Sequence, residues 1–202
     1  MKKTFLKIGS IIIFTLAMIN GKAQNSLDFR WGLFTPVNNN MNHAFSNSRA
    51  FSIGLLHPIS NSRFSAGITF SHQDYQSKED FFKPGFDSHL SIHNYLLTAR
   101  YDFLHQNDFK LYVAMDAGLN KVKNKATQNG ISNERKNAGL TTGIALGADL
   151  KISQRILLGA NIQSQYQFIN NMQFDDKINV NHLTCITGNI GLRFLLGTKK
   201  EI

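Results

Sequence analysis

The sequence predicts an all-β fold, an eight-stranded antiparallel up-and-down barrel that spans a membrane and is preceded by a cleaved signal peptide. From Leu27 onward, apolar and polar residues alternate with a period of two, which is typical of strands with two unlike faces. Long and short connections also follow each other in strict alternation. This indicates a sheet with loops at one end and tight turns at the other.

The composition excludes several other classes of protein. Charged residues make up 17% of the 202 residues, against about a quarter in an ordinary soluble domain. The single cysteine, Cys185, excludes a disulfide scaffold and any multi-thiolate metal site. Outside the N-terminus there is no 18-residue apolar stretch, which excludes a helical membrane protein. The histidines show no metal-binding spacing, and no nucleotide fingerprint or nucleic-acid module is present, so we expect no cofactor, metal or nucleic-acid partner.

Residues 1–23 have the pattern of a secretory signal peptide. A basic start with Lys2, Lys3 and Lys7 precedes the apolar run 8–19, and Gly21-Lys22-Ala23 places small residues at a cleavage site. Cleavage after Ala23 would remove four lysines and no acid, lowering the formal net charge from +9 to +5. The high charge is therefore weak evidence for nucleic-acid binding. We expect residues 24–202 to form one barrel domain.

The eight predicted strands are separated by polar segments and by the three prolines. Strands are expected near 27–35, 49–57, 63–75, 87–103, 109–121, 137–152, 155–169 and 179–196. Long connections are expected at 36–48, 76–86, 122–136 and 170–178, and short ones at 58–62, 104–108 and 153–154. An even number of strands leaves both ends of the chain at the tight-turn end.

Alternation alone does not tell which face of the sheet points outward. A soluble lipocalin-like barrel would bury the apolar face, which carries Trp31, Ile53, Ile68 and Leu158. Three observations favour the reverse arrangement in a membrane. The polar face is rich in Gly, Ser, Thr, Asn and Gln, aromatic residues gather toward strand ends, and several strands exceed the roughly 9–11 residues that cross a bilayer.

With this topology and patterning, residues 27–196 resemble the small eight-stranded outer-membrane barrels of the OmpX and OmpA-barrel type. The last strand, NIGLRFLL at 189–196, is similar to the C-terminal signal that the barrel-assembly machinery reads. The resemblance implies a porin-like protein of the outer membrane of a Gram-negative bacterium. We expect a monomer in contact with outer-membrane lipid, without enzymatic activity, whose four extracellular loops serve surface interaction with an unknown ligand or envelope integrity.

Charged residues on the polar face form the first candidate site. The lumen of eight strands is about wide enough for side chains to fill, so charges confined there must pair. We therefore predict a salt-bridged plug, with a narrow passive channel for anions as the alternative. With Asp28, the candidate residues are Arg30, Arg63, Arg100, Asp102, Lys110, Asp116, Asp149, Lys151 and Arg193.

His89 and Ser91 form a second candidate site on the apolar face near the loop end. Two residues apart on a strand, they share a face, and they resemble the His-x-Ser of outer-membrane lipid A deacylases, in which a histidine activates a serine. The family also needs an acidic residue beside the histidine, and Asp87 is the nearest one. The alternative hypotheses are a lipid A-modifying hydrolase and structural histidines at the membrane interface.

The predicted loop 122–136 and its start are basic. Lys121, Lys123, Lys125, Arg135 and Lys136 face only one acid, Glu134. At the outer surface these side chains could contact the phosphates of lipopolysaccharide. The alternative is a solvated loop without a ligand.

Overall fold

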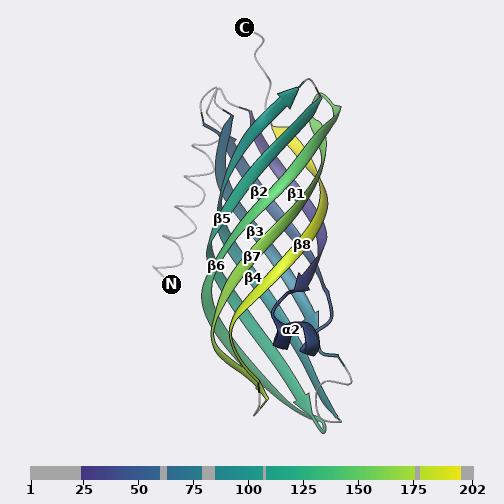
Figure 1. Ribbon diagram of the computed structural model, residues 1–202, viewed down its shortest axis with the longest axis vertical. Helices are drawn as coiled ribbons and strands as arrows, with labels where there is room; N and C mark the ends of the chain where they lie inside the picture. The colour runs from purple at the N-terminus through teal and green to yellow at the C-terminus, as the bar shows by residue number, and fades with distance from the viewer. Residues whose placement is uncertain (1–23, 60–62, 79–84, 107, 176–177, 197–202) are drawn as a thin grey trace, which may run out of the picture.

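The computed structural model describes residues 24–59, 63–78, 85–106, 108–175 and 178–196, and the predicted signal peptide lies outside them. The elements are β1 (Asn25–Pro36), α2 (Asn39–Ala44), β2 (Ser48–Pro58), β3 (Phe64–Gln76), β4 (Phe86–Gln106), β5 (Phe109–Gln128), β6 (Ile131–Ser153), β7 (Ile156–Asp175) and β8 (Ile178–Leu196). Each strand pairs antiparallel with the next, and β8 pairs with β1, so the sheet closes into a barrel (Figure 1). The predicted fold class is confirmed.

The apolar face of the sheet points outward. Trp31 is 57% exposed and Leu97 is 69% exposed, whereas the inward-facing Arg100 is only 2% exposed. Because every strand has two neighbours, no backbone edge is left open where the barrel wall meets hydrocarbon. The orientation predicted for a membrane barrel is confirmed.

Four strands are much longer than a bilayer requires. β4 to β7 contain 20 to 23 residues each. At the loop end, the lower end in Figure 1, they and the start of β8, which pairs with β7 up to Asp175–Ile178, extend beyond β1 to β3. The prediction of long loops at 122–136 and 170–178 was therefore wrong, because most of these residues belong to strands. The polar composition that suggested loops is that of strands exposed to water.

The β5–β6 turn contains only two residues. Asn129 and Gly130 have φ values of 50° and 80°, in the left-handed region at both positions. Such a turn matches the twist of two paired strands, and Asn-Gly is its preferred sequence. It lets β5 and β6 stay paired from Phe109–Leu150 up to Gln128–Ile131.

The loop end, drawn at the bottom of Figure 1, is the outer or upper end of the barrel. Toward it, the apolar and polar faces of the barrel exchange sides. The register aligns one outward apolar row, Phe70, Tyr95 and Leu119, across β3, β4 and β5. One step higher, the outward row contains His72, His93 and Lys121, and the next contains Asp74, Ser91 and Lys123. At this height the inward residues become apolar, with Leu90, Ile92 and Val122 at most 1% exposed. The exchange marks the upper edge of the apolar belt.

Above the belt, the barrel interior is packed like that of a water-soluble protein. We name this group the outer core; it comprises Phe34, Met41, Ala44, Phe45, Ala50, Tyr75, Leu90, Ile92, Val122, Ile169, Val180, Leu183 and Cys185, all at most 5% exposed. Cys185 is thus a small packed residue. In the described part of the chain, no helix is long and apolar enough to cross a bilayer.

The short helix α2 covers the outer core and is tied to both sides of the barrel mouth. On the β8 side, the backbone N–H of Val37 donates to the Thr184 carbonyl (2.8 Å), and Asn38 Nδ2 donates to the His182 carbonyl (3.0 Å). After β3, Lys78 donates from its backbone N–H to the Ala44 carbonyl (2.9 Å) and from Nζ to the Asn42 carbonyl (2.7 Å). The long connection predicted at 36–48 therefore folds into a lid that hydrogen bonds hold to β8 and to the end of β3.

Candidate functional site

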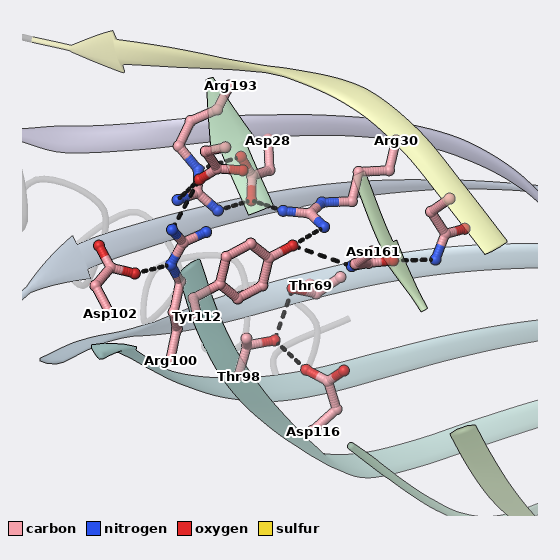
Figure 2. Close-up of polar contacts among 12 residues, drawn as sticks. Asp28, Arg30, Thr69, Thr98, Arg100, Asp102, Tyr112, Asp116, Asn161 and Arg193 are labelled. Carbon is pink, nitrogen blue, oxygen red and sulfur yellow. Dashed lines mark hydrogen bonds and ion pairs between the residues drawn. The ribbon is translucent and has the colours of Figure 1, made fainter. Parts of the chain in front are cut away.

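The interior near the tight turns contains an ion-paired group that we name the charge cluster: Asp28, Arg30, Arg100, Asp102, Lys110, Asp149 and Arg193. Figure 2 labels five of them, Asp28, Arg30, Arg100, Asp102 and Arg193. Arg193 donates from Nε and Nη2 to the two oxygens of Asp28, at 2.6 Å each. Arg193 Nη1 lies 2.9 Å from Asp149 Oδ2, the same atom that accepts from Arg100 Nη2 at 2.7 Å. One carboxylate on β6 thus joins guanidinium groups from β8 and β4.

Tyr112 of β5 lies in the middle of the charge cluster. The guanidinium carbon of Arg100 is 3.6 Å from the centre of the Tyr112 ring, and those of Arg30 and Arg193 are 5.5 and 5.9 Å away. Its hydroxyl accepts from Arg30 Nη1 at 2.5 Å and from Asn161 Nδ2 at 3.3 Å. Figure 2 shows the ring between the side chains of Arg100 and Arg30. Tyr112 therefore links strands on different sides of the lumen.

Burial explains why these charges are paired so closely. Arg100 and Asp149 have side chains that are 1% exposed, and an unpaired ion at such a place costs several kcal/mol. Asp102 accepts from Arg100 Nε at 2.5 Å and lies 4.0 Å from Lys110 Nζ. The ion pairs of the cluster lie within single strands, between neighbouring strands and between strands that are not neighbours, as in Arg100 of β4 with Asp149 of β6.

Three residues predicted for this group lie elsewhere. Arg63 is exposed at the rim and donates from Nη1 to the Phe103 carbonyl at 3.1 Å. Lys151 forms an ion pair with Asp108, 3.3 Å away at the rim, with both side chains more than 40% exposed. Asp116 faces the lumen above the charge cluster. The expectation of a single shared group was wrong for these three, because facing parity does not fix the depth of a residue along the barrel.

Asp116 is bound by neutral donors. Its two oxygens accept from Thr98 Oγ1 and from Gln163 Nε2, at 2.6 Å each. The Thr98 hydroxyl in turn lies 2.7 Å from that of Thr69 (Figure 2). This carboxylate therefore begins a hydrogen-bonded level above the ion pairs.

Between the charge cluster and the outer core, amide and hydroxyl side chains fill the lumen. We name these buried residues the amide layer: Gln73, Asn94, Asn120, Thr141, Gln165 and Gln167. Gln73 Nε2 donates to Gln165 Oε1 at 3.0 Å, and Gln167 Nε2 donates to Gln73 Oε1 at 3.2 Å. In a second chain of hydrogen bonds, Asn120 Nδ2 donates to Thr141 Oγ1 at 3.0 Å, and Thr141 Oγ1 donates to Asn94 Oδ1 at 2.9 Å.

A small polar cavity remains in the lower lumen. It measures about 60 Å³, and Asp28, Arg30, Tyr112, Gln163 and Gln165 are among its lining residues. This volume holds a few water molecules. It is far smaller than a pocket for an organic ligand, which is typically about 300–1,000 Å³.

The basic residues predicted for a loop lie on the extended β5–β6 hairpin. Lys123 and Lys136 face each other on the outer side, and both bind Glu134, with Nζ–oxygen distances of 3.0 and 2.9 Å. The hydrogen bonds from Lys136 and Lys123 lower the pKa of Glu134. Arg135 instead pairs with Asn124, whose side chain is buried on the opposite face. The prediction placed the five basic residues together on one loop. In the structure they lie on two faces of a hairpin and do not form one surface.

Lys121 and Lys125 stand on the same outward face as Lys123. Their register partners on β4 are His93 and His89, and Ser91 lies opposite Lys123. Lys121, Lys123 and Lys125 therefore lie side by side with His93, Ser91 and His89 on the outward face of the barrel.

The second predicted site, His89 and Ser91, lies on the outward face of β4. The acidic group near His89 is Asp74 of β3, whose Oδ1 is 3.8 Å from His89 Nε2. The expected Asp87 instead accepts from Ser77 Oγ at 2.8 Å. Among the described residues, no hydrogen bond joins His89 to Ser91, and no group of three or more potential ligands could hold a metal ion.

Sequence reasoning did not identify two features of the interior. Tyr112 has the parity of the polar face, and a large aromatic among small polar residues is the signal that could have marked it. The signal for the outer core was the pair Leu90 and Ile92. These two apolar residues occupy the same face of β4 as the polar residues Thr98 and Arg100 further along the strand.

The closed strand ring with an outward apolar belt and an inward polar face defines a small outer-membrane barrel. The family model described as Opacity family porin protein matches residues 57–194. The chain therefore belongs to this family, whose members and structural neighbours are proteins of the bacterial outer membrane.

Solved structures from several bacteria are similar to this chain. Neisserial surface protein A has 15% sequence identity and a TM-score of 0.57, with 87% of this chain and 98% of that chain covered. OprG from Pseudomonas aeruginosa has 11% identity and a TM-score of 0.55, with coverages of 87% and 97%. Ail, the attachment invasion locus protein of Yersinia pestis, has 15% identity, a TM-score of 0.47 and coverages of 85% and 97%. No curated protein matches the chain.

Proposed function

We propose that this protein is a non-enzymatic outer-membrane barrel with a closed lumen, whose projecting strands serve surface interaction or envelope integrity. The observation that carries the proposal is the filling of the interior at three successive levels. Residues 1–23 would direct export and be removed, and the barrel-assembly machinery would insert the remaining chain as a monomer.

Each level of the lumen opposes the passage of ions for a different reason. Passage through the charge cluster requires breaking ion pairs that are less than 10% exposed, such as Arg193–Asp28. The amide layer offers side chains already bonded to one another. The outer core is mostly apolar, and its Tyr75 hydroxyl already donates to Gln73 Oε1 at 3.1 Å. An ion that leaves water for such an interior loses its hydration. A passive channel is therefore the weaker alternative.

Planar-bilayer conductance tests the closed lumen. We expect the folded protein to produce no stepwise current above that of the empty bilayer. Protein that runs at its folded position on an unheated gel must be used, and a known porin inserted in the same way shows that insertion is detected. Reproducible current steps from the folded protein would contradict the proposal.

The proposed interaction surface is the strand-paired part of β4–β7 beyond the apolar belt, together with the α2 lid. Paired strands and a lid fixed by backbone hydrogen bonds present a surface that loses little conformational freedom on binding. The extracellular ligand would therefore contact an ordered sheet, in contrast to a set of four long loops.

Release of fatty acid from lipid A tests the non-enzymatic half of the proposal. We expect the purified protein in mixed micelles to release no more fatty acid than heat-denatured protein, because Asp74, the acid beside His89, lies 3.8 Å from His89 Nε2, beyond hydrogen-bond distance. Mass spectrometry of the lipid products makes the measurement. Release that is lost in Ser91→Ala, with the barrel still folded, would support the hydrolase alternative.

A further inference from the structure

A row of imidazole and ammonium groups lies on the outside of the barrel, directly above the apolar belt. His72, His93 and Lys121 are register partners across β3, β4 and β5. The row beneath them contains Tyr95 and Leu119, which are 49% and 62% exposed. The ammonium nitrogen of Lys121 is 5.6 Å from the centre of the Tyr95 ring, so this charge lies at the top of the belt.

A hydrogen-bond chain fixes how the two histidines hold their protons. Asp74 Oδ2 lies 2.7 Å from His72 Nε2, and His72 Nδ1 lies 3.1 Å from His93 Nδ1. The carboxylate accepts, so His72 Nε2 carries a proton, and in a neutral ring His72 Nδ1 is then the acceptor. His93 Nδ1 must donate to it, which leaves a lone pair on His93 Nε2.

One added proton changes the outer end of this chain. If His93 takes it, Nε2 becomes an N–H group directly. If His72 carries the charge, His72 Nδ1 donates to His93 Nδ1, and the remaining proton of His93 again sits on Nε2. In both arrangements the protonated pair presents a charge-assisted donor beside Lys121. The rings are stacked with centroids 4.5 Å apart, which holds the pair in place.

The surrounding charges favour an anion at this place. On β5, Lys121 and Lys123 face β4, and on β2, Arg49 is the register partner of Asp74. The acid within the group, Asp74, is bound by His72 and lies 3.8 Å from His89. Glu134 is bound by Lys123 and Lys136, which leaves Lys121 as the cation beside the two histidines.

We propose that His93 and Lys121 form a site for the phosphate of an acylated outer-leaflet lipid, lipid A, and that the site binds more tightly as pH falls. The apolar belt below accommodates acyl chains, and the cationic row above faces the headgroup, so charge and polarity both match this ligand. The inference rests on the proposed outer-membrane function and adds to it the lipid class and the pH dependence.

The test uses the full folded barrel in an uncharged maltoside detergent and measures binding of lipid A by native mass spectrometry. We expect bisphosphorylated lipid A to bind more tightly than dephosphorylated lipid A. Lys121→Ala should weaken binding of the phosphorylated form about fivefold, the effect of one exposed charge. Lys151→Ala removes the same charge at the opposite rim, where Lys151 pairs with Asp108, and should leave binding unchanged.

The pH dependence is isolated with His93→Gln. The phosphate itself loses charge on acidification, so the ratio of wild-type to His93→Gln affinity is the useful quantity. Desolvation and the neighbouring His72 and Lys121 lower the pKa of His93, so we expect this ratio to rise about fivefold between about pH 8 and about pH 4. Equal binding of dephosphorylated lipid A, equal losses in Lys121→Ala and Lys151→Ala, or a ratio independent of pH would overturn the inference. Conductance and gel mobility test the closed barrel separately. A failure of the proposed function can therefore be told apart from a failure of the lipid A site.

Discussion

Replacing Arg100 with alanine is expected to lower the free energy of unfolding by about 3–5 kcal/mol. Arg100 donates to Asp102 and Asp149 and stacks on the Tyr112 ring. Its removal leaves Asp149, 1% exposed, with Arg193 as its remaining cation. Urea unfolding in phospholipid vesicles, followed by gel mobility and extrapolated linearly to zero urea, gives the free energy.

The matched control for this prediction is Arg63→Ala. Arg63 has the same side chain but is exposed at the rim, with one hydrogen bond to a backbone carbonyl. Its loss should change the free energy by less than about 0.5 kcal/mol. Combining Arg100→Ala with Asp149→Ala should cost less than the sum of the two single variants, because the second change removes the stranded ion. Equal effects of Arg100→Ala and Arg63→Ala would show that the charge cluster does not stabilise the barrel.

Much of the fold could be predicted because a membrane barrel repeats one simple rule. The side-chain period of two and the alternation of connections located all eight strands and the outward face. The strand ends at Gln128 and Ile131 were missed because a strand above the membrane has the polar composition of a loop. The Asn129-Gly130 pair was the local signal for a tight hairpin turn there.

The candidate site was predictable only in part. Parity correctly placed Arg30, Arg100 and Arg193 in the lumen, where the structure pairs them with carboxylates. Which charges meet depends on strand tilt and on contacts across the barrel, and neither can be read from one strand. For the same reason, the central place of Tyr112 becomes visible only when β1 and β5 are seen to face each other across the lumen (Figure 2).

The exchange of faces on β4 predicts two very different costs for one substitution. Leu97 and Ser91 both have outward parity on this strand, but Leu97 lies within the apolar belt and Ser91 above it. Leu97→Arg should lower the free energy of unfolding by about 2–4 kcal/mol, because it places a charge in hydrocarbon.

Ser91→Arg should change the free energy by less than about 1 kcal/mol, since charges near the membrane interface cost little. Unfolding in phospholipid vesicles measures both variants under the same conditions, and Leu97→Ala serves as the control for lost side-chain volume. A large cost for both arginine variants would place hydrocarbon around His93 and Lys121, and the belt would then end higher than the structure indicates. A small cost for both would mean that Leu97 faces water and not lipid. The barrel would then be a water-soluble one, and the membrane assignment would be wrong.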